Sequence, residues 1–258
     1  MLIKVTNHCA MGCKHCMEDS TVAGAHMPVD LFEQALQFSF EMEALARQVT
    51  RLPTAILLSG GECSDHPAFE ELIERVEQRG MVPALITHGQ WLHDRALRER
   101  VLRPGRFLHV YVTNDPRFYP RSVTLDFTDE RVLVRHRVTT LIPLGRAARR
   151  ALPDDQPLKG PASFNLRSLT RATGDVRKAI ALLRVRSGSH GAGACTPSIS
   201  EDGSIHAADS RFCFSIGTID SPAEALTEAL VHMQCNRCGL VDRLTPAQKE
   251  AIGEVSHR

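Results

Sequence analysis

Short apolar runs rich in branched side chains recur along the first 145 residues and are separated by stretches with helical periodicity. The runs expected to form strands cover residues 2–5, 55–59, 84–87, 107–113 and, less regularly, 132–142. Strands that alternate with helices in this way build parallel βα units. The sequence therefore predicts an α/β fold with a parallel sheet.

The intervals between these runs have the apolar spacing of amphipathic helices. Apolar residues recur at steps of three and four from Ala35 to Val49, which predicts one long helix. Asp30 and Glu33 have the spacing of a capping box at its start. Further helices are expected over residues 69–76 and 92–101.

The regular alternation ends after residue 143, where a polar stretch begins. Asp202 and Gly203 stand between short apolar runs, which predicts a hairpin over residues 199–205. Helices are expected around residues 176–183 and after Pro222. We place a domain boundary near residue 150, so that 1–150 is the main domain and 151–258 a linker with a small C-terminal subdomain.

The charges of the chain nearly cancel, because its 258 residues include 31 Lys and Arg against 30 Asp and Glu. A net charge of +1 provides no field that would attract nucleic acid or an acidic membrane surface. The first residues become polar too soon for a signal peptide, and apolar runs of about 18 residues do not occur. The sequence therefore predicts a cytoplasmic protein with neither nucleic acid nor membrane among its partners.

Eight cysteines need an explanation, because disulfides are uncommon in the cytosol. Cys9, Cys13 and Cys16 follow the first expected strand, at the end where parallel sheets build their sites. Three thiolates from one loop can converge on a metal centre. His8 or His15 could complete a zinc site with four ligands. A three-cysteine iron–sulfur cluster would instead leave one iron free to bind a small molecule.

The CxxxCxxC spacing resembles the signature of the radical S-adenosylmethionine (AdoMet) superfamily. Ser59, Gly60, Gly61 and Glu62 end the second expected strand and are similar to that family's GGE element, which binds the amino group of AdoMet. Glycines let a backbone approach a ligand closely, and a carboxylate pairs with an ammonium group. The resemblance covers about residues 1–145. It implies a partial (β/α)6 barrel of the TIM type, with AdoMet and a [4Fe–4S] cluster on the three cysteines.

Other residues match the family pattern more loosely. His15 occupies a usually aromatic position beside adenine, and Thr87-His88-Gly89 is similar to the family's TNG strand end. Thr113 and Asn114 end the fourth expected strand, where the family often contacts ribose. Each of these residues also has a structural interpretation of equal weight, as an ordinary polar residue of a loop or strand end. The family's glycine element on the fifth strand is not recognisable here.

The second cysteine group consists of Cys195, Cys213, Cys235 and Cys238. One pair brackets the expected hairpin and the other forms a CxxC turn. Taken alone, this arrangement fits a zinc ribbon. Beside a radical AdoMet core it resembles the twitch subdomain, a shortened SPASM extension in which a hairpin and a helix hold one auxiliary [4Fe–4S] cluster.

Cys63 directly follows the GGE element, where the family commonly has proline. A free buried cysteine is the favoured interpretation. The catalytic alternative is a thiol that returns a hydrogen atom to a substrate radical.

The resemblance also implies a reaction. The first cluster would be reduced by flavodoxin or ferredoxin and would pass one electron to AdoMet. The resulting 5′-deoxyadenosyl radical abstracts hydrogen from the substrate. An auxiliary cluster that accepts an electron from the substrate radical makes the enzyme an oxidoreductase.

Three functions remain open. The first is oxidative modification of a peptide, the RiPP-type maturation common among SPASM and twitch proteins. The second is dehydrogenation or a related biosynthetic step on a small molecule, which suits a compact chain with one auxiliary cluster. The third is a non-enzymatic zinc or iron–sulfur binding protein, against which the GGE element and the strand pattern argue.

Overall fold

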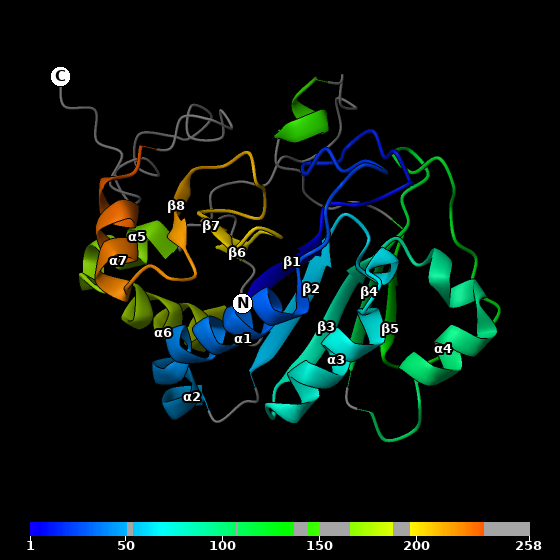
Figure 1. The fold of residues 1–258 in the computed structure, drawn as a ribbon, viewed down its shortest axis with the longest axis horizontal. Helices are drawn as coiled ribbons and strands as arrows, with labels where there is room; N and C mark the ends of the chain where they lie inside the picture. Colours follow the sequence, from blue (N-terminus) through cyan, green and yellow to red (C-terminus); the bar gives the residue numbers. More distant parts are fainter. Residues whose placement is uncertain (51–53, 107, 137–143, 150–165, 188–196, 235–258) are drawn as a thin grey trace.

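The computed structural model describes residues 1–50, 54–106, 108–136, 144–149, 166–187 and 197–234. Within them, the strands form one eight-stranded sheet in the order β5-β4-β3-β2-β1-β6-β7-β8 (Figure 1). The strands are β1 (Leu2–Thr6), β2 (Ala55–Gly60), β3 (Val82–Thr87), β4 (His109–Thr113), β5 (Val132–Arg135), β6 (Ser198–Ile199), β7 (Ser204–His206) and β8 (Ser215–Thr218). The first six strands pair in parallel, whereas β7 and β8 are antiparallel. The expected α/β class and parallel sheet are therefore confirmed.

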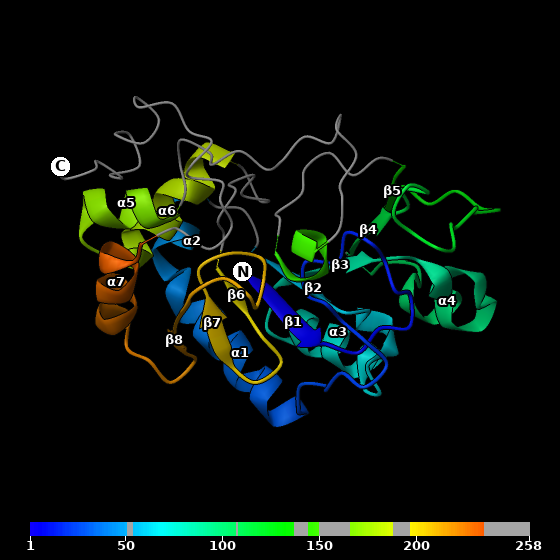
Figure 2. The ribbon, with the colours of Figure 1, turned by 90° about the horizontal axis from the view of Figure 1, so that it is seen from above.

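Helices α1 and α3 cover one face of the parallel strands (Figures 1 and 2). The α-helices are α1 (Val29–Met42), α2 (Ala44–Thr50), α3 (Phe69–Gln78), α4 (Arg95–Val101), α5 (Leu166–Thr173), α6 (Val176–Ser187) and α7 (Ala223–His232). Short 3-10 helices cover Cys63–Asp65, Gln90–His93 and Gly145–Arg149. The core between sheet and helices includes Ile3, Val5, Ile56, Leu58, Phe32, Leu36, Leu72 and Ile73. Alternate strand residues such as Ile3 and Val5 meet the helices, so Lys4 and Thr6 lie on the opposite face.

The single long helix expected from Ala35 to Val49 is wrong, because the chain breaks at Glu43 between α1 and α2. The buried carboxylate of Glu43 binds the amino terminus of Met1 at 2.6 Å and Arg184 at 2.7 Å. Satisfying this buried charge outweighs the continuous apolar spacing.

The expected capping box is also wrong. Pro28 occupies the N-cap of α1, no side chain caps it, and Asp30 lies inside the first turn. Glu33 forms ion pairs with Arg75 and Arg79 of α3 instead, at 2.8 Å each. Its role is to hold two helices together.

The C-terminal hairpin is confirmed as β6 and β7, and β6 pairs with β1. Helices α5, α6 and α7 lie beside this end of the sheet (Figure 2). The proposed boundary near residue 150 falls where the chain is not described, so the division into domains stays a prediction. None of the helices in the described part of the chain has the length and apolarity that a bilayer crossing requires.

Candidate metal and cofactor site

Cys9, Cys13 and Cys16 lie in the loop after β1, at the carboxyl edge of the parallel strands, and their side chains are partly exposed. Loss of solvation raises the pKa of Cys9 to about 11 and that of Cys13 to about 12, and the charge of Cys16 adds to both shifts. A metal centre deprotonates its cysteine ligands, because its positive charge stabilises the thiolate form that burial disfavours. The donor set therefore suits a cationic centre that binds all three thiolates.

The three thiols come from one loop, but their present arrangement does not enclose a single metal ion. In the part of the chain that the structure describes, no group of three or more His, Cys, Asp or Glu side chains is arranged to hold a metal ion. His8 is used elsewhere, since its Nδ1 atom lies 3.2 Å from an Asp65 oxygen.

The cysteine loop is anchored to the end of β2 through the two glycines of the GGE element. The N–H of Gly61 donates to the carbonyl of Thr6 at 2.7 Å, and the N–H of Glu62 donates to that of His8 at 2.9 Å. A Cβ atom at Gly60 or Gly61 would stand 2.0 Å from the Thr6 or His8 oxygen, respectively. Only glycine allows this close approach, so the element positions the base of the cysteine loop.

Glu62 is a buried hub between β2 and β3, with 0% exposure. One carboxylate oxygen accepts hydrogen bonds from the Ser64 N–H, the Ser64 hydroxyl and the Thr87 hydroxyl, at 3.1, 2.7 and 2.6 Å. The other oxygen accepts from the His88 N–H at 2.9 Å. The expected contact between Glu62 and AdoMet stays a prediction, and the structure adds a second role for this carboxylate, which joins two strand ends.

The residues expected near ribose also have partners within the chain. The Thr113 hydroxyl is hydrogen bonded to the Tyr119 hydroxyl, and the Asn114 amide binds both backbone groups of Val123. Ser59 is partly exposed and lies opposite Lys4 in the β1–β2 register. Their contacts with a ligand remain predictions.

His15 lies in an aromatic cluster that the sequence did not reveal. Its ring centroid is 4.8 Å from that of Phe118 and 4.9 Å from that of Tyr119. Burial lowers the pKa of His15 to about 4, so the imidazole is neutral at pH 7. Its buried Nδ1 atom has no hydrogen-bond partner among the described residues, and this leaves a polar atom beside the cysteine loop that a ligand can satisfy.

Arg146, which sequence analysis missed, contacts the cysteine loop from the 3-10 helix at 145–149, drawn in bright green beside the dark blue loop (Figures 1 and 2). Its guanidinium donates to the Cys13 carbonyl at 3.0 Å and to the Ser20 carbonyl at 2.8 Å. No local pattern signals this contact, because the partners are 133 and 126 positions apart.

Cys63 is fully buried in the core and its thiol donates to the Ile86 carbonyl at 3.6 Å. Burial raises the pKa of this thiol well above its usual value. The placement favours the structural interpretation, and the hydrogen-atom donor stays a prediction.

In the second cysteine group, Cys213 is described, whereas Cys195, Cys235 and Cys238 lie outside the described residues. The N–H of Cys213 donates to the Ser210 carbonyl at 3.0 Å, and the Ser210 hydroxyl donates to the Met17 carbonyl at 2.8 Å. Ser210 thus links Cys213 to Met17, the residue that follows Cys16, through two hydrogen bonds. The auxiliary cluster itself stays a prediction.

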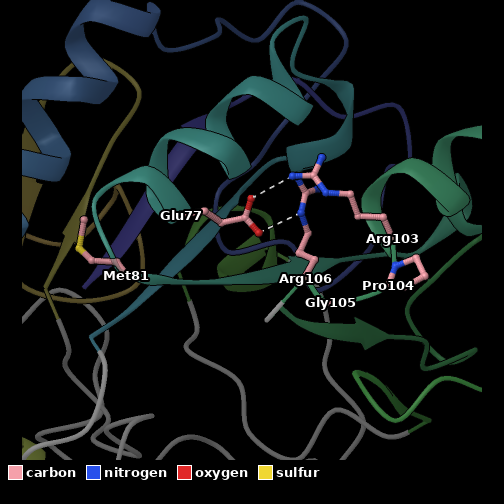
Figure 3. Close-up of a pocket in the computed structure, with 6 residues that line it drawn as sticks. All are labelled: Glu77, Met81, Arg103, Pro104, Gly105 and Arg106. Atoms are coloured by element: carbon pink, nitrogen blue, oxygen red, sulfur yellow. Dashed lines mark ion pairs between the residues drawn. The ribbon is translucent and has the colours of Figure 1, made fainter.

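A pocket of about 450 Å³ lies at the opposite edge of the sheet, near the starts of β3 and β4 (Figure 3). Its lining consists of Glu77, Met81, Arg103, Pro104, Gly105 and Arg106. The Glu77 carboxylate lies 2.9 Å from the Arg106 guanidinium and 3.7 Å from that of Arg103, so it pairs with both (Figure 3). This arrangement ties α3 to the start of β4 and is remote from the cysteine loop.

No family model and no curated protein matches the sequence. Among solved structures, the fold is similar to that of BtrN, crystallised in complex with AdoMet and 2-DOIA, with 12% sequence identity and a TM-score of 0.49. The match covers 90% of this chain and 81% of the BtrN chain. A likeness at this identity concerns the fold and says nothing about what this chain binds.

Proposed function

We propose that this protein is a radical AdoMet enzyme whose [4Fe–4S] cluster is bound by Cys9, Cys13 and Cys16. The observation that carries the proposal is the attachment of the CxxxCxxC loop to the GGE element by backbone hydrogen bonds from Gly61 and Glu62. Two motifs 44 or more positions apart meet at the carboxyl edge of a parallel sheet, where such folds bind ligands.

Three cysteine thiolates in one loop have the donor chemistry that this cofactor requires. When bound, the cluster supplies the electron that breaks the sulfonium bond of AdoMet and so yields the 5′-deoxyadenosyl radical. The glycine edge of β2 positions the loop, and the rings of Phe118 and Tyr119 pack against His15 within it. The free Nδ1 atom of His15 offers adenine a hydrogen-bond partner.

For the reaction itself, we assign the oxidative modification of a peptide, supported by the resemblance of the C-terminal cysteines to a twitch subdomain. The auxiliary [4Fe–4S] cluster of Cys195, Cys213, Cys235 and Cys238 would accept the substrate's electron, and flavodoxin or ferredoxin would reduce the first cluster. Dehydrogenation of a small molecule is the alternative. Co-expression with a candidate precursor peptide, followed by mass spectrometry for the loss of two hydrogen atoms, tests the peptide assignment.

Metal content and AdoMet cleavage test the proposal as a whole. Anaerobically reconstituted protein should carry about eight iron and eight sulfide per chain, as two four-iron clusters require. Dithionite should then drive slow release of 5′-deoxyadenosine from AdoMet. Alanine at the three loop cysteines should remove about half of the iron and all of the cleavage. Stoichiometric zinc with little iron would instead support the non-enzymatic zinc protein.

A further inference from the structure

Arg146, a residue from a distant segment, binds three backbone carbonyls of the cysteine loop through its side chain and its backbone N–H. The Arg146 guanidinium donates from Nη1 to the Cys13 oxygen, from Nη2 to the Ser20 oxygen and from Nε to an Asp19 oxygen at 3.1 Å. The Arg146 N–H also donates to the Cys16 oxygen at 2.9 Å. One residue thus binds the carbonyls of two of the three loop cysteines.

This contact is tightly packed. Gly145 has φ +56°, and a Cβ atom there would stand 2.6 Å from the Met17 oxygen, so the 145–149 helix lies directly against the loop. The Arg146 side chain is 16% exposed, which limits screening of its charge by water. The planar guanidinium places three donors at fixed angles, a geometry that lysine lacks.

We propose that Arg146 is a positioning residue for the iron–sulfur cluster, one that fixes the cysteine loop in its binding shape and holds a positive charge beside it. The inference rests on the proposed function, since it concerns the cluster assigned there. Hydrogen bonds and charges around a cluster set both its retention and its reduction potential.

The two effects can be separated by the choice of substitution. Arg146→Lys keeps the charge but loses the fork of donors, so the loop is less well held. Arg146→Gln loses the charge as well. A positive charge stabilises the more negative, reduced form of a cluster, so its removal should shift the potential to lower values.

Arg149 provides a matched control. It belongs to the same 3-10 helix, carries the same charge and pairs with Asp19, but its side chain is 62% exposed. Among the residues that the structure describes, its guanidinium donates to Asp19 and to no cysteine carbonyl, whereas that of Arg146 donates to the Cys13 carbonyl. Arg149→Gln therefore removes a charge from this helix without removing the clamp on the loop.

The experiment uses the full chain, reconstituted anaerobically with iron and sulfide, as wild type, Arg146→Gln, Arg146→Lys and Arg149→Gln. Iron and sulfide per chain are measured first. The midpoint potential is then measured by dithionite titration, followed through the part of the electron paramagnetic resonance spectrum that changes when AdoMet is added. Circular dichroism of the protein without iron shows whether each variant folds.

We expect Arg146→Gln to lose more than half of the AdoMet-responsive cluster and to shift the potential of the remainder downward. Arg146→Lys should also load less cluster but keep the wild-type potential, and Arg149→Gln should match the wild type in both measurements. If Arg146→Gln does not fold, Arg146→Lys and Asp19→Asn, which weakens the acceptor of the Arg146 Nε–H by removing its charge, carry the test through cluster loading.

Wild-type loading and potential in folded Arg146→Gln would overturn the inference and leave the proposed function intact. An unchanged potential in a poorly loaded Arg146→Gln would overturn its electrostatic part. Equal losses in Arg149→Gln would overturn it too, because the clamp on the loop would then be irrelevant. If the wild type takes up no cluster at all, the proposed function fails, whatever the variants do.

Discussion

Replacing Glu62 tests whether this carboxylate serves the fold as well as the ligand. In Glu62→Gln, the amide oxygen can keep the three donors that now share one carboxylate oxygen, but the NH2 group then faces the His88 N–H. One hydrogen bond to a charged acceptor is lost and two donors meet. The expected cost is about 2 kcal/mol of unfolding free energy, because bonds to charged groups contribute about 1.5–3 kcal/mol.

Glu62→Ala should cost more, about 4 kcal/mol, because it also leaves the Thr87 hydroxyl and two partly buried N–H groups without their acceptor and opens a cavity. Urea unfolding of the protein without iron or AdoMet measures both values. Glu71→Gln is the control, since this half-exposed partner of Arg75 should contribute less than about 0.5 kcal/mol. If Glu62→Gln has wild-type stability but binds AdoMet more weakly, the role of Glu62 in joining the ends of β2 and β3 is refuted. Glu62 would then be a ligand contact alone.

Three further predictions follow from the same contacts. Gly61→Ala should lose the AdoMet-responsive cluster, because its Cβ atom would stand 2.0 Å from the His8 oxygen. Gly80→Ala has open space around it and should keep the cluster, with a loss of about 1–2 kcal/mol of unfolding free energy from its positive φ. Equal iron content in both variants would contradict this prediction. Burial lowers the pKa of His66, whose Nδ1 atom accepts the Ala68 N–H at 3.0 Å, so the unfolded chain binds the proton first and stability should fall as the pH drops below about 6.5. Urea midpoints measured between pH 8 and 5 should fall less steeply with pH in His66→Gln than in the wild type. An unchanged pH dependence in this variant would contradict the assignment to His66. Cys213→Ser should lower iron by about four per chain while AdoMet cleavage persists, and full iron content would argue against the auxiliary cluster.

The parallel strands were predictable because their signal is local. Branched apolar runs of four to seven residues recur at intervals that a helix can span, and β1 to β4 lie where these runs were expected. The hairpin of β6 and β7 was predictable for the same reason, since Asp202 and Gly203 provide the turn chemistry. The CxxxCxxC and GGE motifs were visible as short patterns, and the packing of Gly60 and Gly61 explains why glycine is required there.

The contacts that sequence analysis missed all join distant segments. The break at Glu43 depends on the amino terminus and on Arg184, and the clamp on the cysteine loop depends on Arg146. Apolar periodicity reports which face of a segment is buried, but it carries no information about which buried charge meets which partner. The aromatic cluster at His15 was missed for the same reason, because Phe118 and Tyr119 are about 100 positions away.

Three long-range contacts converge on the loop between β1 and α1. Gly61 holds its base from β2, Arg146 binds its middle from the 145–149 helix, and Ser210 binds Met17 from the segment before Cys213. The loop buries Met11 and Met27, but its three thiols are partly exposed. The positions of the thiols therefore depend on hydrogen bonds from three other elements, and a loss at any one of them should reach the cysteines before it reaches the core. Cluster loading should accordingly be more sensitive than global stability to substitutions at these three anchors.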